Sequence, residues 1–451
     1  MGVSILDENQ KQLIWAHTSN LILVSGSTIL AAKLSQDRRL SARRSGPQRV
    51  NCGRDQLAQH EKLRPAISIA RSNMGIQKMR LTNEMSLKIL RAGGTMKIDN
   101  LTFIPHRLRR RGRWQTASYT ADYVDVFYVK IQTDDGVTGI GAGSIVPNGR
   151  GVPFIEGIEK VKAAAGYLLV GRDPFQISPL MDSLHREVQG YKRHKAGIEL
   201  ALYDLMGKAL NVSLSTLLGG TMRDVIPVIR MLSMGSAAEM AETASTFVKQ
   251  GFKHLKVKLG TDPAVDLERF KAVRSAVGAE VTLTVDFNGA YDAVTAVNII
   301  KSLIPMGLAM VEQPVPGTDL KGMEAVTQAV EPVVLADQGV ESSGEVFQVA
   351  ATNSANAVSV KLLKFGGLKK CMAAARVCEA AGLICHVGGM ATSCLIDAAQ
   401  AHFISVTPSV VTPSEVGEFE ALEGDLVEGL EVVNGNVRVP TGPGLGVNFT
   451  V

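Results

Sequence analysis

From Arg223 onward, short apolar segments alternate with amphipathic stretches of helical period. The apolar segments occupy residues 225–232, 254–260, 281–287, 308–314, 332–338, 357–367 and 383–389, and their starts lie 24 to 29 residues apart. This spacing predicts repeated βα units around a parallel sheet. Seven clear units and a weak eighth near 409–425 favour an α/β fold of the (β/α)8-barrel type, spanning 223–425. An open dinucleotide-binding sheet is disfavoured, because no G-x-G-x-x-G follows the first strand.

The residues before the barrel predict an N-terminal α+β capping domain at 96–222. "MKIDNLTFIPHRL" (96–108) and "DVFYVKIQTDDGVTGIGAG" (125–143) alternate apolar and polar residues like antiparallel strands, with a turn at Asp135-Gly136. Helical periodicity follows from about 152 to 218 and ends at the glycines of "LLGG". The last segment, 426–451, is typical of strand and turn, and we expect it to return to the cap.

Residues 1–95 differ from the rest of the chain in charge. They hold 15 Lys and Arg against 6 Asp and Glu, whereas the residues after them hold 33 against 37. The mildly acidic main body does not favour nucleic-acid binding, and no apolar run is long enough to span a membrane. We interpret 1–95 as a poorly ordered basic extension, or as a start chosen upstream of Met96. A targeting peptide and a small packed appendage are the alternatives.

The cysteines indicate in which cellular compartment the protein is expected. Five are present, and four lie in apolar surroundings between Cys371 and Cys394 at spacings that match no zinc pattern. Buried free thiols are typical of a reducing compartment, so we expect a cytoplasmic protein.

Three successive predicted strands end in a carboxylate. Asp286, Glu312 and Asp337 are separated by 26 and 25 residues, one βα repeat each. We therefore expect the three side chains to converge at the carboxyl ends of the barrel strands, where active sites of this fold lie. Buried carboxylates repel one another, and a hard divalent cation is the simplest way to stabilise them; Mg²⁺ suits an all-oxygen site, with Mn²⁺ as the alternative. A single acidic residue at a strand end is more often a helix cap or an ion-pair partner, but three at the barrel repeat favour a metal site.

Lysines accompany these carboxylates. In "HLKVKLG" (254–260), Lys256 and Lys258 stand at alternate positions of the second predicted strand, so both point to one face. We expect each ammonium group to lower the pKa of the other, which would give a neutral amine base near neutral pH. Lys361, in the sixth strand, lies across the barrel mouth, and bases on both faces of a planar enolate can remove and return a proton. Surface lysines at a rim are the alternative, which explains poorly why they lie among apolar neighbours.

Together these residues resemble the muconate lactonizing enzyme subgroup of the enolase superfamily. The resemblance rests on Lys256-Val-Lys258, Asp286 in "DFN", Glu312 in "EQP", Asp337 in "LADQ" and Lys361 in "SVKLLKFGGL", and it spans residues 96 to 451. It implies Mg²⁺ held by the three carboxylates, and Lys258 and Lys361 as the acid/base pair. It also implies that Lys256 stabilises charge, that the substrate is a small carboxylate and that the protein is a homo-oligomer.

Some positions depart from this resemblance. Gln338 follows Asp337 where the subgroup usually has Glu, so the surroundings of Asp337 are expected to differ. Thr392 in "GGMATS" stands where many members have an acidic residue, which weakens a dipeptide epimerase or muconate cycloisomerase interpretation. His386 on the seventh strand is similar to the base of the mandelate racemase branch. Because the sixth strand here offers Lys361, we interpret His386 as a packed strand residue.

Substrate binding is expected at the cap. "RLRRRGRWQTASYTAD" (107–122) and "SIVPNGRG" (144–151) lie where the family has mobile loops over the barrel mouth. Trp114 could stack on a substrate ring or cation, and we add Asn288 and Thr392 as substrate-binding candidates. The alternative for the first segment is a solvated basic loop with one anchoring aromatic residue.

These inferences lead to one hypothesis and its alternatives. We predict Mg²⁺-dependent abstraction of the proton α to a substrate carboxylate, in a racemase or epimerase of an amino-acid derivative, with proline-like compounds among the candidates. A dehydratase or a cycloisomerase would share the same first step, so the motif residues do not separate them. A non-catalytic carboxylate-binding protein is the alternative of another class, disfavoured because binding alone needs no opposed bases.

Overall fold

The computed structural model describes residues 5–7, 12–17, 20–25, 28–33, 96–145 and 154–451, and the chain divides into two compact units, Met1–Gly75 and Ile76–Val451. The described part of the first unit is an antiparallel sheet in the order β1-β2-β3-β4. Its strands are β1 (Ile5–Asp7), β2 (Gln12–His17), β3 (Asn20–Ser25) and β4 (Thr28–Lys33). The prediction of a poorly ordered extension over 1–95 falls mostly on residues outside those described.

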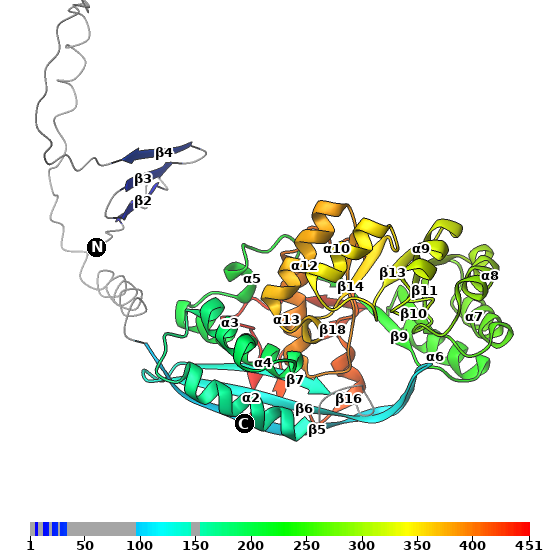
Figure 1. Cartoon of the computed structure of the whole chain (residues 1–451), viewed down its shortest axis with the longest axis horizontal. Helices are drawn as coiled ribbons and strands as arrows, with labels where there is room; N and C mark the ends of the chain where they lie inside the picture. Colours follow the sequence, from blue (N-terminus) through cyan, green and yellow to red (C-terminus); the bar gives the residue numbers. More distant parts are fainter. Residues whose placement is uncertain (1–4, 8–11, 18–19, 26–27, 34–95, 146–153) are drawn as a thin grey trace, which may run out of the picture. The chain divides into compact units, whose positions relative to one another are not determined.

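The cap is an antiparallel sheet covered by helices (Figure 1). Its strands are β5 (Ile98–Gln115), β6 (Thr120–Thr133) and β7 (Thr138–Ile145), and its helices are α2 (Phe154–Leu169), α3 (Ile177–Glu187), α4 (Lys192–Leu210) and the short α5 (Leu214–Leu217). The predicted turn at Asp135-Gly136 joins β6 to β7, with Gly136 at a φ of 88°. Helix α4 packs closely on β7 because the strand carries glycines there; a Cβ on Gly141 would collide with the carbonyl of Gly197.

One predicted feature of the cap is wrong. The segment 107–122, expected as a mobile loop over the barrel mouth, forms the distal part of the β5–β6 hairpin. Its pairing shifts register between Arg109 and Trp114, across the run of charged residues. The other predicted loop, 144–151, lies outside the described residues from 146 onward.

The larger domain is built on a parallel sheet of seven strands in the order β15-β14-β13-β12-β11-β10-β9. The strands are β9 (Ile229–Leu232), β10 (His254–Lys258), β11 (Thr282–Asp286), β12 (Leu308–Glu312), β13 (Val333–Ala336), β14 (Ala357–Val360) and β15 (Ile384–Val387). The helices are α6 (Ala237–Lys249), α7 (Pro263–Val277), α8 (Ala293–Leu303) with the 3-10 turn η2 (Ile304–Met306), α9 (Leu320–Ala329), α10 (Ser343–Thr352), α11 (Leu362–Phe365), α12 (Leu368–Ala381) and α13 (Cys394–Ser405).

Short polar residues begin several of these helices. Asp292 accepts hydrogen bonds from the backbone N–H groups of Val294 and Thr295, both at 3.0 Å, at the start of α8. Asp262 and Ser342 do the same for α7 and α10. Each such cap contributes about 1 kcal/mol and ends the preceding loop at a defined residue, which sets where the helix begins.

The barrel closes through residues 409–416. Ser414 pairs in parallel with Val228, and its carbonyl accepts the N–H of Ile229 at 2.9 Å. On the other side, the N–H of Cys385 donates to Ser409 and the N–H of Glu415 donates to Val387, both at 3.0 Å. This segment therefore fills the eighth position between β15 and β9, and the predicted barrel class is confirmed.

The chain then returns to the cap. The 3-10 turn η3 (Glu418–Ala421) leads into β16 (Leu422–Glu423), which pairs with β5. The return thus begins slightly before the predicted residue 426. The remaining short strands are β17 (Val427–Glu428) with β20 (Asn448–Phe449), and β18 (Val432–Val433) with β19 (Asn436–Arg438), which also pairs with β8 (Val225–Pro227).

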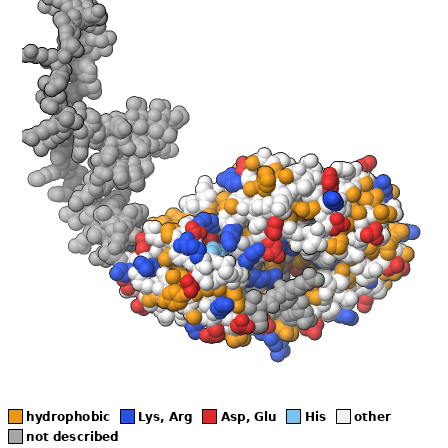
Figure 2. Space-filling view, in the orientation of Figure 1, with side chains coloured by type: hydrophobic (Ala, Val, Ile, Leu, Met, Phe, Trp, Pro, Cys, Tyr) orange, Lys and Arg blue, Asp and Glu red, His pale blue; other side chains and the backbone are white. Residues whose placement is uncertain are grey.

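No helix in the described part of the chain is long and apolar enough to cross a membrane. The four described cysteines are buried and free. Figure 2 shows acidic and basic side chains interspersed over the visible face.

Candidate active site

The strand register brings the predicted carboxylates and lysines to one end of the barrel. Lys258 pairs with Asp286, and Asp286 pairs with Glu312, in neighbouring parallel strands. Asp337 follows the last residue of β13 directly. Because paired residues of parallel strands point to the same face, these side chains converge inside the barrel at the carboxyl ends of the strands.

Lys256 and Lys258 are both held by carboxylates. The Nζ of Lys258 donates to Asp286 at 2.5 Å. The Nζ of Lys256 lies 2.8 Å from Glu312, 2.7 Å from Glu415 and 3.2 Å from Asp286, and its side chain is 1% exposed. Lys256 is therefore at the centre of a buried charge network rather than at a solvated rim.

This network corrects one expectation. Burial by itself lowers the pKa of Lys256, but Glu312, Glu415 and Asp286 outweigh it and hold the pKa well above its ordinary value. The prediction that Lys258 makes Lys256 a weaker base is therefore wrong for Lys256. Three carboxylates at close range act more strongly on it than one neighbouring ammonium, so Lys256 is a fixed positive charge.

Lys361 stands opposite Lys258. β10 and β14 are separated by three strands on one side and by β15, residues 409–416 and β9 on the other. The Nζ of Lys361 donates to Asp337 at 2.8 Å and lies 3.9 Å from Glu312. Although burial opposes it, the Asp337, Glu312 and Glu415 carboxylates raise the pKa of Lys361 above its ordinary value. The two lysines thus face the barrel axis from opposite walls.

Lys364 completes the surroundings of Asp337 and was not predicted. Its Nζ donates to the Asp337 carboxylate at 2.7 Å and to the backbone carbonyls of Asp337 and Ser359 at 2.8 and 2.9 Å. Burial opposes ionisation of Asp337, but Lys361 and Lys364 hold its pKa well below the usual range. A lysine three residues after Lys361, in "SVKLLKFGGL", is the signal that could have found it.

Gln338, the residue after Asp337, contacts the site through its backbone rather than its side chain. The Oε1 of Gln313 accepts the backbone N–H groups of Asp337 at 2.7 Å and Gln338 at 2.8 Å. The end of β13 is therefore positioned by Gln313 from β12 through the backbone, while the Gln338 side chain is exposed.

Asp286, Glu312 and Asp337 fit a hard divalent cation. All three side chains are buried and offer only oxygen ligands, which Mg²⁺ prefers. The Oε1 of Glu312 has no hydrogen-bond partner among the described residues. Burial raises the pKa of Glu312 to about 8, Lys256 opposes this, and Asp286 and Asp337 add to it. A cation is the group that would satisfy this oxygen and offset the repulsion among the carboxylates.

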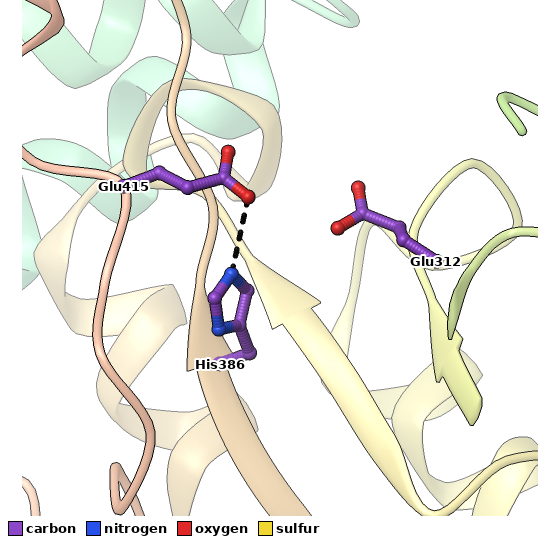
Figure 3. Close-up of side chains that lie close together, drawn as sticks. All are labelled: Glu312, His386 and Glu415. Atoms are coloured by element: carbon purple, nitrogen blue, oxygen red, sulfur yellow. Dashed lines mark hydrogen bonds and ion pairs between the residues drawn. The ribbon is translucent and has the colours of Figure 1, made fainter. Parts of the chain in front are cut away.

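Glu415, at the end of the closing segment, is the main residue that the sequence analysis missed. It accepts Lys256 Nζ, His386 Nε2 at 3.2 Å and the backbone N–H of Gly389 at 2.7 Å. Figure 3 shows His386 and Glu415 pointing toward each other, with Glu312 facing them. Among the described residues, these three are the group whose ligand atoms all lie within 4.8 Å of one another, and this group shares only Glu312 with the predicted metal-binding set. The signal that could have found it is its place as the first acidic residue of the weak eighth unit near 409–425.

The predicted substrate-binding residues lie in different surroundings. Asn288 donates hydrogen bonds to the Asp286 carboxylate from its side-chain amide at 3.1 Å and from its backbone N–H at 2.8 Å, so it orients that carboxylate. Thr392 is buried, and its hydroxyl has no partner among the described residues. Trp114 packs on Met231, the β9 residue in register with Lys256, and the Arg110 guanidinium lies 4.4 Å from its ring centroid.

A cavity of about 1300 Å³ lies beside Trp114, between the cap hairpin, α6 and η3. Its lining includes Arg110, Met231 and Glu418 and none of the three predicted catalytic lysines. The cavity therefore lies where the cap hairpin meets β9 and η3, and the residues of the charge network are not part of its lining.

Comparisons with known proteins agree with this architecture. The model of the mandelate racemase/muconate lactonizing enzyme N-terminal domain matches residues 99–219, and that of the enolase C-terminal domain-like family matches 239–450. Together the two matches cover the cap and most of the barrel.

Individual relatives match this chain over nearly their whole length. An N-succinyl-L-Arg/Lys racemase of Bacillus cereus is 29% identical over 78% of this chain and 96% of its own. A chloromuconate cycloisomerase of Cupriavidus necator is 32% identical over 74% of this chain and 91% of its own. The structure of a dipeptide epimerase from Enterococcus faecalis, complexed with Mg and the dipeptide L-Leu-L-Tyr, superposes with a TM-score of 0.75 at 28% identity, covering 78% of this chain and 99% of that one.

Proposed function

Since the chain belongs to the muconate lactonizing enzyme subgroup of the enolase superfamily and its relatives include racemases, epimerases and cycloisomerases, we propose that it is a Mg²⁺-dependent racemase or epimerase of an amino-acid derivative. The observation that carries this proposal is the pair of lysines on opposite walls of the barrel, Lys258 on β10 and Lys361 after β14. Inversion at a carbon needs a proton removed on one face and another delivered on the other, and opposed amines can do both.

The residues divide the reaction between them. Asp286, Glu312 and Asp337 would hold Mg²⁺, whose charge stabilises the negative charge that develops on the substrate carboxylate. One amine, Lys258 or Lys361, takes the α-proton, and the electron pair of the broken C–H bond moves into the carboxylate to form an enolate. The opposite lysine, as an ammonium, donates its proton to the other face of the α-carbon. Lys256 adds a fixed positive charge, since three carboxylates keep it protonated.

The relatives and the site together narrow the substrate class. The Bacillus cereus relative is named for N-succinyl amino acids and the Enterococcus faecalis structure holds a dipeptide, so both names point to amino acids whose amino group is acylated. In this chain the buried Thr392 stands where many members have an acidic residue, so this position has no carboxylate for a substrate ammonium. We therefore favour a substrate whose α-nitrogen is acylated, with proline-like derivatives included.

A cycloisomerase of an unsaturated dicarboxylic acid is the second candidate. It is favoured by the chloromuconate cycloisomerase of Cupriavidus necator, at 32% identity. It needs only one of the two opposed amines, so it leaves the other lysine without a role. A dehydratase and a non-catalytic carboxylate-binding protein are further alternatives for the function. We also propose that the protein is cytoplasmic and that it is a homo-oligomer.

The test is α-proton exchange. The full chain with Mg²⁺ in D₂O is incubated with N-succinyl, N-acetyl and dipeptide forms of each amino acid, with prolines and with cis,cis-muconate, and followed by proton NMR. We expect loss of the α-proton signal with one acylated class. Lys258→Ala and Lys361→Ala should each lower the rate by about 10²- to 10⁴-fold, the contribution of a general acid or base.

A matched control is Lys301→Ala, which removes an exposed lysine on α8 and should leave the rate unchanged. Conversion of one enantiomer into the other that survives in both active-site variants would refute the two-base proposal. Lactone formation from muconate without exchange of any amino-acid derivative would select the cycloisomerase instead.

A further inference from the structure

A helix of the cap lies directly on the turn that follows Lys361. Lys361 begins α11, which ends at Gly366 and Gly367, at φ values of 90° and 128°, before α12 starts. A Cβ on Gly366 would stand 3.2 Å from the Cβ of Lys192, and one on Gly367 would collide with the carboxylate of Glu199. Both contacts come from α4, so the glycines allow the cap helix to approach the backbone of this turn.

The Glu199 carboxylate lies at the start of α12. The residue before this helix is Gly367, which has no side chain to accept the free N–H groups of the first turn. The Glu199 carboxylate instead lies against Gly367, close enough for the backbone N–H groups of Leu368 and Lys369 to lower its pKa. Glu199 is only 2% exposed, and its Oε2 has no hydrogen-bond partner among the described residues. The carboxylate therefore joins the cap to the barrel at one buried point.

Backbone hydrogen bonds connect this point to Lys361. The N–H of Phe365 donates to the carbonyl of Lys361 at 3.0 Å, and the N–H groups of Gly366 and Gly367 both donate to Leu362 at 3.0 Å. The segment from Lys361 to Gly367 is thus one compact turn held by backbone hydrogen bonds. Lys361 therefore begins the same hydrogen-bonded turn that Glu199 contacts at Gly367.

We propose that Glu199 is a positioning residue for Lys361: the cap, through this carboxylate, sets the turn that aims the Lys361 amine at the substrate. The inference rests on the proposed function of Lys361 as one of the two proton-transfer groups. It assigns to the cap a part in arranging the catalytic lysine, in addition to any contact with the substrate.

The carboxylate also makes this link sensitive to pH. Burial raises the pKa of Glu199 to about 7, against the opposing effect of the Leu368 and Lys369 backbone N–H groups and of the Lys370 and Lys369 side chains. The remaining titratable groups that face it are the Cys371 thiol and the Tyr203 hydroxyl. A neutral carboxyl accepts backbone hydrogen bonds more weakly than a carboxylate. We expect the turn to loosen as the pH falls below 7.

The experiment compares wild type, Glu199→Gln and Glu199→Asp in the full chain. Hydrogen–deuterium exchange of the α12 first turn, corrected for intrinsic rates, reports the cap itself. In wild type we expect protection to fall about tenfold from pH 8 to pH 6, as the attraction between the ionised carboxylate and the N–H groups of this turn is lost. Glu199→Gln should show the low protection at both pH values. The labelling rate of Lys361 by trinitrobenzenesulfonate at pH 8, relative to the exposed Lys301, reports the position of the amine without any substrate.

The control and the outcomes separate the two proposals. Glu341→Gln breaks the exposed ion pair between Glu341 and Lys192, another cap–barrel contact of 2.8 Å, and should behave like wild type. We expect Glu199→Gln to change Lys361 labelling several-fold and to lower the α-proton exchange rate with little effect on KM, with partial rescue in Glu199→Asp. Unchanged Lys361 labelling, whatever the α12 protection, would overturn the positioning role. If wild type exchanges no α-proton at all, the proposed function fails, while the labelling still decides the role of Glu199.

Discussion

Asp397 should make the folded chain less stable as the pH rises toward 8. Its side chain is fully buried on α13, where it accepts the N–H of Gly417 at 2.9 Å, that of Phe419 at 3.3 Å and the Gln400 amide at 2.9 Å. It thereby holds the backbone that follows Glu415. Burial raises the pKa of Asp397 to about 7 although the two backbone N–H groups oppose this, and Glu418 adds to the effect.

The magnitude follows from linkage between ionisation and folding. A pKa of about 7 in the folded chain, against about 3.9 when unfolded, corresponds to about 4 kcal/mol at full ionisation. The folded state binds the proton more tightly than the unfolded state, so stability decreases as the pH rises from about 4 to about 7. Between pH 5 and pH 8, the decrease amounts to about 2.5 kcal/mol.

Asp397→Asn removes this ionisation and keeps an oxygen for the backbone N–H groups. We expect the variant to gain about 2.5 kcal/mol relative to wild type when the pH is raised from 5 to 8. Urea unfolding followed by circular dichroism at both pH values measures this difference, and the titration of other groups cancels because both proteins contain them. Asp292→Asn is the control: hydrogen bonds from the Thr295 backbone and side chain lower the pKa of this exposed carboxylate, so it is ionised at both pH values. If the free energy of unfolding of Asp397→Asn differs from that of wild type by the same amount at pH 5 and at pH 8, the buried carboxylate is charged at both pH values and the reasoning is refuted.

Two further predictions concern the turn after Lys361 and the carboxylate cluster. Gly367→Ala should destabilise the protein by about 1–3 kcal/mol or more, because an alanine is strained at a φ of 128° and its Cβ collides with Glu199. Thermal unfolding measures this loss of stability. The control is Gly344→Ala in α10, where the atom nearest to the added Cβ is 3.8 Å away, and this variant should be neutral or slightly stabilising. Mg²⁺ at about a hundred times its Kd should stabilise the chain by about 2.7 kcal/mol and EDTA should reverse this. Glu312→Gln should abolish the gain, and a Mg²⁺-induced shift in Tm that persists in this variant would place the ion elsewhere.

The barrel and its main charged residues could be predicted because they are encoded by local periodicity. Strands recur at one βα repeat, and Asp286 and Glu312 each end a strand, as Lys258 does. Parallel pairing in register then brings such residues together whatever the details of packing. The hairpin at 107–122 was mistaken for a loop because its charged residues obscure the alternation, and its pairing with β16, more than 300 residues later, has no local signal.

Contacts between distant residues explain what could not be predicted. Glu415 lies 159 residues from Lys256 and meets it only because residues 409–416 close the barrel. Glu199 reaches Leu368 because α4 packs on the glycine turn, and a glutamate in an amphipathic helix has no feature that distinguishes it from a solvated one.

The order of strands, the class of fold and the identity of the lysines and carboxylates thus follow from residue types at regular spacing, which short-range conformational preferences and burial enforce. Which charges pair, which proton affinities rise or fall and how the cap contacts the Lys361 turn depend on distances across the fold. Electrostatic energies vary steeply with separation and burial, so the surroundings of Lys256 had to be seen in three dimensions before its charge state could be assigned.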